Sequence, residues 1–295
     1  MLAAQPVNAQ NRLTLQTLQV GDSDDARQSG FYLKYRRALS RESYLGAGAG
    51  THDFSDDSGS RRFNVLTAEY RQVLSGPFAF RAEAAQYFSS SWSPFTGNGS
   101  LIVTPGERWR IEAMIGLDLV DTYTAIELEN QFTTIGLSAD YRFHRDWTLV
   151  GFIFRQDFKD DNVRRGLLGR LVWEIGYLDW LRAELNLRRI GSDIRGVGYF
   201  SPDKLTEGFV QLTASKVMFD ENAVFSALLG LGLQSIDDTD PRTLFLGELR
   251  GRGWFTDKWG MTARLGARNT GDTNFATGGE EYLYWYAKLE LIYAW

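Results

Sequence analysis

The chain has 295 residues, no cysteine, only two histidines and a formal net charge of −5. These counts exclude disulfide scaffolds, thiolate metal sites, cysteine nucleophiles and multi-histidine metal centres, and no basic tract suggests nucleic-acid binding. Aromatic residues make up 14% of the chain and no apolar run approaches 18 residues, so neither a disordered chain nor a transmembrane helix is expected. Composition leaves two candidates, a soluble all-β domain and an outer-membrane β-barrel.

Period-2 alternation recurs along the whole chain, whereas helical spacing is hard to find. From Trp109 to Leu119 the odd positions are apolar or small, while Arg110, Glu112 and Asp118 lie on the other face. About sixteen such segments follow one another, each near the ~10 residues of a tilted membrane-spanning strand. Their approximate centres are Leu15, Leu33, Ala47, Ala68, Ala82, Ile102, Ile115, Leu137, Phe152, Leu171, Leu185, Leu212, Leu229, Leu249, Leu265 and Leu289.

The connections between these segments are predicted to alternate between short and long. The short ones are residues 40–42, 75–77, 105–107, 144–146, 177–179, 220–222 and 256–258. The longer, polar ones are residues 21–30, 52–62, 89–99, 121–131, 191–205, 236–242 and 269–281, with a modest one at 157–162. This alternation is typical of outer-membrane barrels, which have short periplasmic turns and longer extracellular loops, and an even strand number places both termini in the periplasm.

The last segment, residues 282–295, alternates apolar residues with Tyr284, Tyr286 and Lys288 and ends on Trp295, like the terminal strand of bacterial outer-membrane proteins. Six tryptophans near strand ends are expected in aromatic girdles: Trp109, Trp147, Trp173, Trp180, Trp259 and Trp295. Lipid offers no hydrogen bonds to backbone groups, so the strands must close on themselves. The expected fold is all-β, a transmembrane antiparallel β-barrel over residues 10–295, with residues 1–9 as a linker or the remnant of a signal peptide.

A barrel of this width leaves an aqueous lumen, so functional residues are sought on the polar face. That face carries fifteen basic residues: Lys34, Arg36, Arg71, Arg81, Arg110, Arg142, Arg164, Arg170, Arg182, Arg188, Arg250, Arg252, Arg264, Arg268 and Lys288. It carries nine acidic ones: Glu69, Glu83, Glu112, Asp118, Asp140, Glu174, Glu184, Glu248 and Glu290. Cross-strand ion pairs that stiffen the wall account for most of them, and the arginine excess is suited to anionic or carboxylated solutes.

Aromatic residues on the same face would let sugar rings stack while charged groups bind the hydroxyls. The candidates are Tyr32, Tyr87, Tyr284, Tyr286 and Trp254, of which Tyr284 and Tyr286 join the charged residues as a predicted substrate path. The alternative is that these rings belong to the girdle or fill the wall, because a one-residue shift in register reverses the face.

A more specific signal is the segment Gly198-Tyr199-Phe200-Ser201-Pro202, which precedes a predicted strand over residues 208–217. It resembles the Gly-Tyr-aromatic-Ser-Pro segment in the C-terminal barrels of exopolysaccharide export proteins, the tetratricopeptide-containing outer-membrane subunits of cellulose and poly-N-acetylglucosamine secretion systems. Strand number and barrel length extend the resemblance over nearly the whole chain, although no helical repeat of about 34 residues precedes the barrel. The resemblance implies a lipid-embedded conduit for polysaccharide, a periplasmic scaffold, an inner-membrane synthase complex and no cofactor.

The predicted connection over residues 191–205 is a candidate gating loop, in which Tyr199, Phe200, Ser201 and Pro202 would cross the opening. The alternative is that the segment only caps the strand that follows. The alternatives to export are a general or anion-preferring diffusion porin, and a structural or adhesin-like barrel plugged by its loops.

Catalysis has little support from the sequence. His52 beside Asp53, in a predicted loop, could activate a water, but two adjacent residues in an acidic loop are a weak signal. His144 lies in a predicted turn with no nucleophile nearby. The sequence therefore favours a non-enzymatic barrel.

Overall fold

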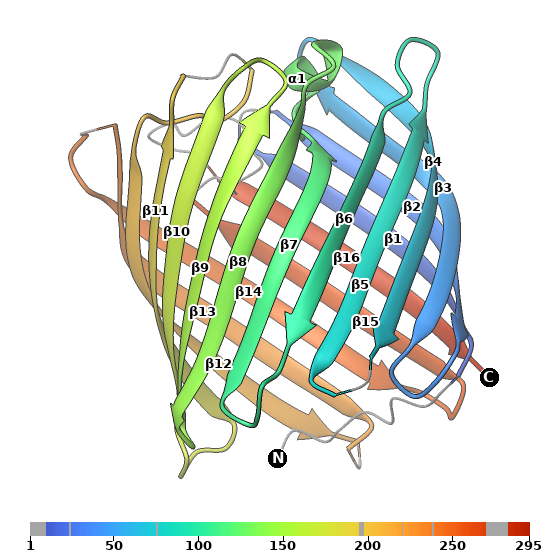
Figure 1. Ribbon diagram of the computed structural model, residues 1–295, viewed down its shortest axis with the longest axis vertical. Helices are drawn as coiled ribbons and strands as arrows, with labels where there is room; N and C mark the ends of the chain where they lie inside the picture. The colour runs from blue at the N-terminus through green and yellow to red at the C-terminus, as the bar shows by residue number, and fades with distance from the viewer. Residues whose placement is uncertain are drawn as a thin grey trace.

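The computed structural model describes residues 10–23, 25–74, 76–194, 198–219, 221–237, 239–269 and 283–295. Within them, sixteen antiparallel strands form a closed barrel in chain order, and β1 pairs with β16 to close it (Figure 1). The elements are β1 (Arg12–Asp22), β2 (Arg27–Ala38), β3 (Tyr44–Asp56), β4 (Gly59–Val73), β5 (Phe78–Phe88), β6 (Phe95–Val103), β7 (Trp109–Leu119), α1 (Tyr123–Glu127), β8 (Gln131–His144), β9 (Trp147–Phe158), β10 (Val163–Glu174), β11 (Leu181–Ser192), β12 (Leu205–Met218), β13 (Ala223–Ile236), β14 (Arg242–Trp254), β15 (Trp259–Arg268) and β16 (Tyr284–Ala294). The predicted fold class is confirmed, and each predicted segment centre falls in a different strand. The predicted linker, residues 1–9, lies outside the described residues.

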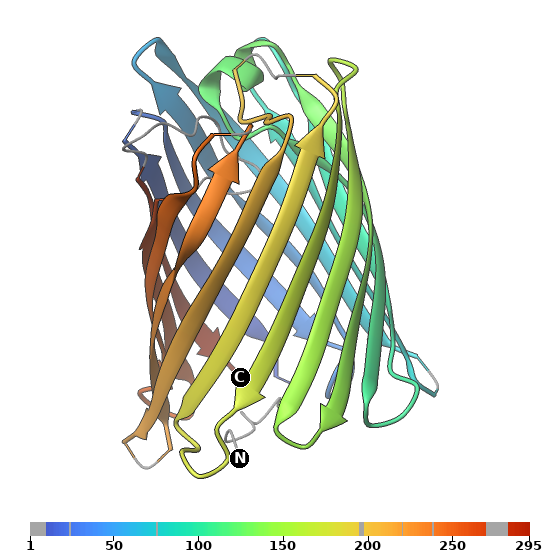
Figure 2. The same cartoon turned by 90° about the vertical axis from the view of Figure 1, so that its left-hand side faces the viewer.

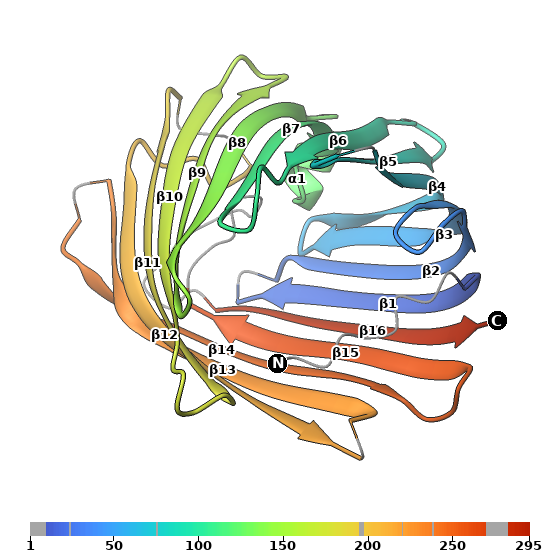
Figure 3. The same ribbon diagram turned by 60° about the horizontal axis from the view of Figure 1, so that its bottom comes forward.

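The two ends of the barrel differ. β1 begins and β16 ends at one end of the barrel, here called the termini end, and α1 lies at the opposite end, the α1 end (Figures 1 and 3). The strands are strongly tilted and continue from one end to the other (Figure 2). Among the described residues, no helix is long and apolar enough to cross a membrane.

Some of the connections that were predicted to be long are shorter in the structure. β1 ends at Asp22 and β2 begins at Arg27, while β3 ends at Asp56 and β4 begins at Gly59, so the predicted loops 21–30 and 52–62 are mostly strand. The reason is that Phe54 in the second of these segments is only 1% exposed and packs inside the barrel, which keeps the paired strands together past the polar residues. The long connections at the α1 end include those from β7 to β8 and from β11 to β12.

The outer face of the barrel is apolar. On β13, Phe225, Leu229, Leu231 and Leu233 are 48 to 72% exposed, whereas Leu228 on the alternate face is 6% exposed. Because apolar groups on this scale are stable only away from water, the outer face is suited to lipid.

Aromatic rings on the outer face gather near the termini end. Trp109 stacks on Tyr141 with ring centroids 4.3 Å apart, and Trp147 stacks on Trp173 at 5.3 Å. Further round the barrel, Trp259 contacts Tyr293, and Tyr293 stacks on Trp295 at 5.4 Å. This belt has the position of the aromatic girdle at a membrane interface.

The α1 end of the interior holds a packed core. Tyr32, Phe54, Phe63 and Val65 from β2, β3 and β4 form one cluster with Ile126 of α1. α1 begins after Thr122, whose side chain accepts a hydrogen bond from the backbone N–H of Ala125 at 3.1 Å. This helix was not predicted, because five residues are too few for a helical period to show.

One residue predicted on the lipid-facing side of the barrel packs on the inner side. Leu119, the last residue of β7, was assigned to the lipid face with the other odd positions of that strand. It is 1% exposed and packs with Phe54, Phe63 and Ile126. The assignment was wrong because α1 begins close behind Leu119 and supplies an apolar surface on the inner side.

Candidate functional site

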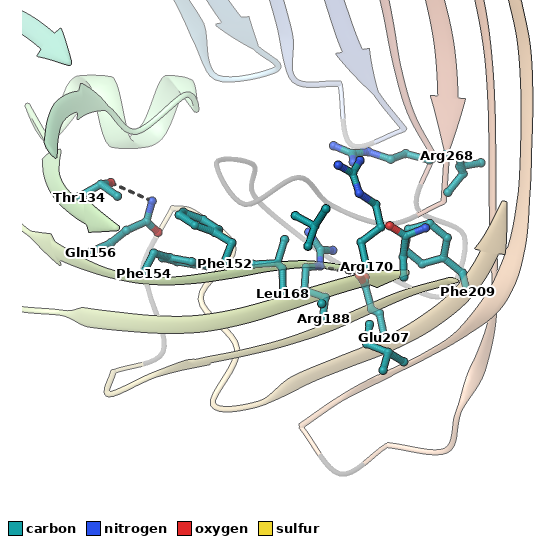
Figure 4. Close-up of a pocket in the computed structure, with 15 residues that line it drawn as sticks. Thr134, Phe152, Phe154, Gln156, Leu168, Arg170, Arg188, Glu207, Phe209 and Arg268 are labelled. Atoms are coloured by element: carbon teal, nitrogen blue, oxygen red, sulfur yellow. Dashed lines mark hydrogen bonds and ion pairs between the residues drawn. The ribbon is translucent and has the colours of Figure 1, made fainter. Parts of the chain in front are cut away.

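The strand register shows which residues share the inner face. Residues of β8 to β12, most of them at alternate positions, line one cavity of 440 Å³ inside the barrel together with Leu246 of β14 and Arg268 of β15 (Figure 4). Following the Cα partners round the sheet from these residues places every predicted substrate-path residue on that same face: Arg36, Arg81, Arg110, Arg142, Arg170, Arg182, Arg188, Arg250, Arg252, Arg264, Arg268, Glu112, Glu184, Glu248, Tyr284 and Tyr286.

Ion pairs join many of the charged residues of the inner wall. Arg36 donates to Glu69 through both Nε and Nη2, the second bond at 2.7 Å. Arg182 Nε lies 2.8 Å from Glu184 Oε1, and Arg170 Nη1 lies 3.5 Å from Glu184 Oε2. The pair of Arg170 with Glu184 crosses from β10 to β11, as predicted, whereas Arg182 and Glu184 pair along β11 itself.

The two partners of these pairs are not equally exposed. The Glu184 side chain is 1% exposed and that of Glu248 is 5% exposed. Their partners are far more open, with Arg170 at 45% and Arg264 at 51%. These two acids therefore lie against the wall beneath their arginines, and the water in the lumen meets the guanidinium groups there.

Like charges also face each other across neighbouring strands. Arg250 of β14 is the Cα partner of Arg264 of β15, and Arg264 is the partner of Lys288 of β16. Directly opposed like charges destabilise a sheet unless a counter-charge is present. Glu248 provides one, because it accepts hydrogen bonds from Arg250, from Arg264 at 2.6 Å and from the Tyr286 hydroxyl.

A cavity of 980 Å³ lies inside the barrel toward the termini end and is called the vestibule here. It lies between the connection from β10 to β11 and the wall formed by β12 to β16. Its acidic lining residues are Glu174 and Asp179. Its basic lining residues are Arg142, Arg145, Arg182, Arg250, Arg252, Arg264 and Lys288.

The four tyrosines among the predicted inward aromatic residues divide into two groups. Tyr32 and Tyr87 belong to the packed core at the α1 end, so they fill the wall there. The rings of Tyr284 and Tyr286 lie under arginines, with Arg268 4.9 Å and Arg264 5.1 Å from the ring centroids. These two tyrosines therefore support arginine side chains by cation–π contact.

The segment over residues 198–202 is held in place by its neighbours. The Tyr199 hydroxyl donates to Asp160 at 2.9 and 3.1 Å, and Asn162 Nδ2 donates to the Tyr199 hydroxyl and to Ser201 Oγ at 3.0 and 2.7 Å. Burial, together with the Asp160 carboxylate, raises the pKa of Tyr199 to about 12, so the hydroxyl keeps its proton at neutral pH. The predicted gating residues thus form an anchored loop at the α1 end.

Two further contacts fix this loop. Arg164 of β10 donates to the Phe200 carbonyl, and its guanidinium lies 4.9 Å from the centre of the Phe158 ring. Gly198 has a φ of +82°, and a Cβ there would lie 2.5 Å from Thr124 Cγ2. Glycine is required at this position because a side chain would meet both a strained backbone and the helix α1.

The comparisons with known proteins give matches to the fold of this chain but none to its sequence. No protein-family model matches the chain, and no curated protein sequence matches it. A solved structure described as a bacterial polysaccharide outer membrane secretin superposes with a TM-score of 0.72 at 12% identity, over 97% of this chain and 99% of that chain. This chain shares that fold. OccK7 (OpdD) and OprD of Pseudomonas aeruginosa, both at 10% identity, give TM-scores of 0.49 and 0.47 over 97% of this chain and 98% and 93% of theirs.

His52 and Asp53, the pair on which a catalytic function would depend, point to opposite faces of the sheet. His52 lies in β3 and not in a loop, and it faces inward against Phe54 with ring centroids 4.4 Å apart. Asp53 lies on the alternate face and pairs with Arg62 at 2.5 Å. Because neighbouring residues of a strand point to opposite faces, this pair cannot act on one water.

Some residues of the site were not identified from the sequence. Glu207 is 2% exposed and holds Arg188 at 2.5 Å, yet the predicted strand began one residue later. Asp160 and Asn162, which anchor Tyr199, lie in a connection to which no role was assigned. A signal was present for Glu207, because it continues the alternation with Phe209 and Gln211.

Proposed function

We propose that this barrel is a passive conduit in the bacterial outer membrane through which a polysaccharide leaves the cell. The superposition on a polysaccharide outer membrane secretin, over nearly the full length of both chains, carries the proposal. The lipid-facing outer surface and the charged inner wall support it, because a polymer of sugars needs a polar path across an apolar layer.

The same proposal includes the orientation of the barrel in the membrane and the direction in which the polymer moves. Both termini face the periplasm, so the polymer enters through the vestibule and leaves at the α1 end. The loop anchored by Tyr199 then narrows the exit, and the substrate path runs along the arginine-rich wall between the two. A periplasmic scaffold and an inner-membrane synthase would meet the barrel at the termini end.

The proposal is tested by polymer release from vesicles. The purified barrel is reconstituted in lipid vesicles loaded with two fluorescent glucans of equal mass, one linear and one branched. A conduit for a threaded polymer releases the linear glucan and retains the branched one. The alternative supported by the basic wall is an anion-preferring porin, which would pass small sugars freely in large, steady currents and retain both glucans.

A further inference from the structure

We infer that the polymer carried by this barrel is acidic, and that the vestibule recognises its anionic groups with arginines free of protein counter-charges. The inference rests on the proposed function and specifies its substrate class. The vestibule is an open cavity lined by more basic than acidic side chains.

Two arginines of the vestibule are available to a ligand. Arg142 of β8 and Arg252 of β14 are exposed, and within the described part of the chain neither has an ion pair. They reach the same cavity from different sides, one from β8 and one from β14. Fixed cations that no carboxylate neutralises attract an anion and can bind it through charge-assisted hydrogen bonds.

The paired basic residues of the vestibule strengthen this field. Arg250 and Arg264 share the single carboxylate of Glu248, whose side chain is 5% exposed, while their own side chains are 47% and 51% exposed. One buried acid thus serves two exposed cations. Because the acid is buried and the two cations are exposed, the three residues together present a net positive charge to the lumen.

A second basic surface lies elsewhere at the termini end. A cavity of 500 Å³ is lined by Arg71, Arg81 and Arg110, with Glu42 as the acid among its lining residues. Arg71 is the Cα partner of Arg81, and the described residues offer Arg71 no ion pair. An incoming polymer therefore meets basic groups on more than one side of the opening, as a chain with repeated negative charges requires.

The chemistry that fits is an oxyanion repeated along a sugar chain, either a carboxylate or a sulfate. Guanidinium groups bind such oxygens in a planar, two-point geometry. A neutral glucan lacks that contact, and a polymer of amino sugars with free ammonium groups would be repelled.

The test measures current block of the barrel in planar bilayers by three polymers of matched length: polygalacturonate, dextran sulfate and neutral dextran. Each is added on the side of the termini. The double variant Arg142→Gln/Arg252→Gln removes the two free cations without exposing a partner acid. The double variant Arg37→Gln/Arg41→Gln removes the same charge from the outer face and a turn near the termini end, and serves as the matched control.

We expect at least one acidic polymer to block at about a tenth of the concentration that neutral dextran needs. The Arg142/Arg252 double variant should raise that blocking concentration about tenfold, and the control should leave it unchanged. Preference for polygalacturonate or for dextran sulfate identifies carboxylate or sulfate as the group bound. Folding of both variants is checked by their heat-dependent shift on gels.

The acidic substrate and the export of a polysaccharide can be refuted separately. If neutral dextran blocks as well as the acidic polymers, or if the double variant behaves like the control, the acidic substrate is refuted while export of a polysaccharide still stands. If no linear polymer enters the barrel in either assay, the proposed function itself is refuted, and the acidic substrate with it.

Discussion

Arg250 on β14 lies directly opposite Arg264 on β15, and both donate to the carboxylate of Glu248 between them. Two cations at this spacing repel each other, so the pairing depends on the acid that lies beneath them. The Glu248 side chain is nearly inaccessible, whereas the two guanidinium groups meet the lumen. The wall is therefore stabilised by an acid that an ion or a polymer in the lumen does not reach.

Replacing this acid should destabilise the barrel. The variant Glu248→Gln leaves Arg250 and Arg264 opposed without a counter-charge, and replaces one of the two acceptor oxygens by an N–H donor. Breaking a buried pair costs about 3–5 kcal/mol, and partial exposure of the arginines to water reduces this to about 1–3 kcal/mol here. The measurement is urea unfolding of the barrel in lipid vesicles.

The matched control is Glu174→Gln, which removes an acid from the same inner wall. The Glu174 side chain is 58% exposed and lies 3.9 Å from Arg182, so its loss should cost less than about 0.5 kcal/mol. Equal losses for the two variants would show that the burial of Glu248 does not matter to the wall.

The assignment of faces gives a second prediction, on neighbouring residues of β12. Val210 is 52% exposed on the outer face, and Gln211 faces inward as the Cα partner of Glu184. An arginine in the apolar layer costs about 2–4 kcal/mol near mid-membrane, whereas an arginine beside Glu184 meets water and a carboxylate. Val210→Arg should therefore reduce the free energy of unfolding in vesicles by that amount, and Gln211→Arg by much less. The opposite order would reverse the faces of the barrel.

The strands could be predicted from the sequence because each strand meets two different surroundings. Lipid on one side and water on the other impose a two-residue period, and the centres near Leu229 and Leu249 were placed by that period alone. The same reasoning placed Arg110 and Glu112 on the inner face. Strand ends were less well placed, as for β3 and β4, because a polar residue near a barrel rim fits a loop and a strand equally well.

The details of the site depend on contacts between distant residues. Asn162 and Ser201 are joined by a hydrogen bond of 2.7 Å although many residues separate them in the chain, and no local pattern marks either one. Burial of Glu184 beneath Arg170 likewise follows from how long side chains lie across neighbouring strands. A two-residue period shows on which face of the sheet a residue lies, but not how deeply its side chain is buried.

The proposed orientation is tested with cysteine labels, to which this chain is suited because it contains no cysteine. Ser58→Cys places a thiol between β3 and β4 at the α1 end, and Asp257→Cys places one between β14 and β15 at the termini end. Both positions are exposed. On intact cells, a membrane-impermeant maleimide should label the cysteine at position 58 and not the one at position 257, while both react in lysed cells. Labelling at position 257 alone would invert the barrel and its proposed direction of transport.

The anchored loop at the α1 end gives the last prediction, because its restraint depends on a proton. Tyr199 donates to Asp160 only while it is protonated, and burial raises its pKa to about 12 from an unfolded value near 10. The hydrogen bond therefore contributes fully below about pH 10 and is lost as the pH rises through 12. In planar bilayers, the open fraction of the barrel should stay constant between pH 6 and 9 and increase only above pH 10. Tyr199→Phe removes the donor at every pH, which costs about 1 kcal/mol and corresponds to about a fivefold larger open fraction at pH 7, and it should abolish the rise at high pH. An open fraction in Tyr199→Phe equal to that of the unmodified barrel at pH 7 would mean that this loop does not restrict the exit.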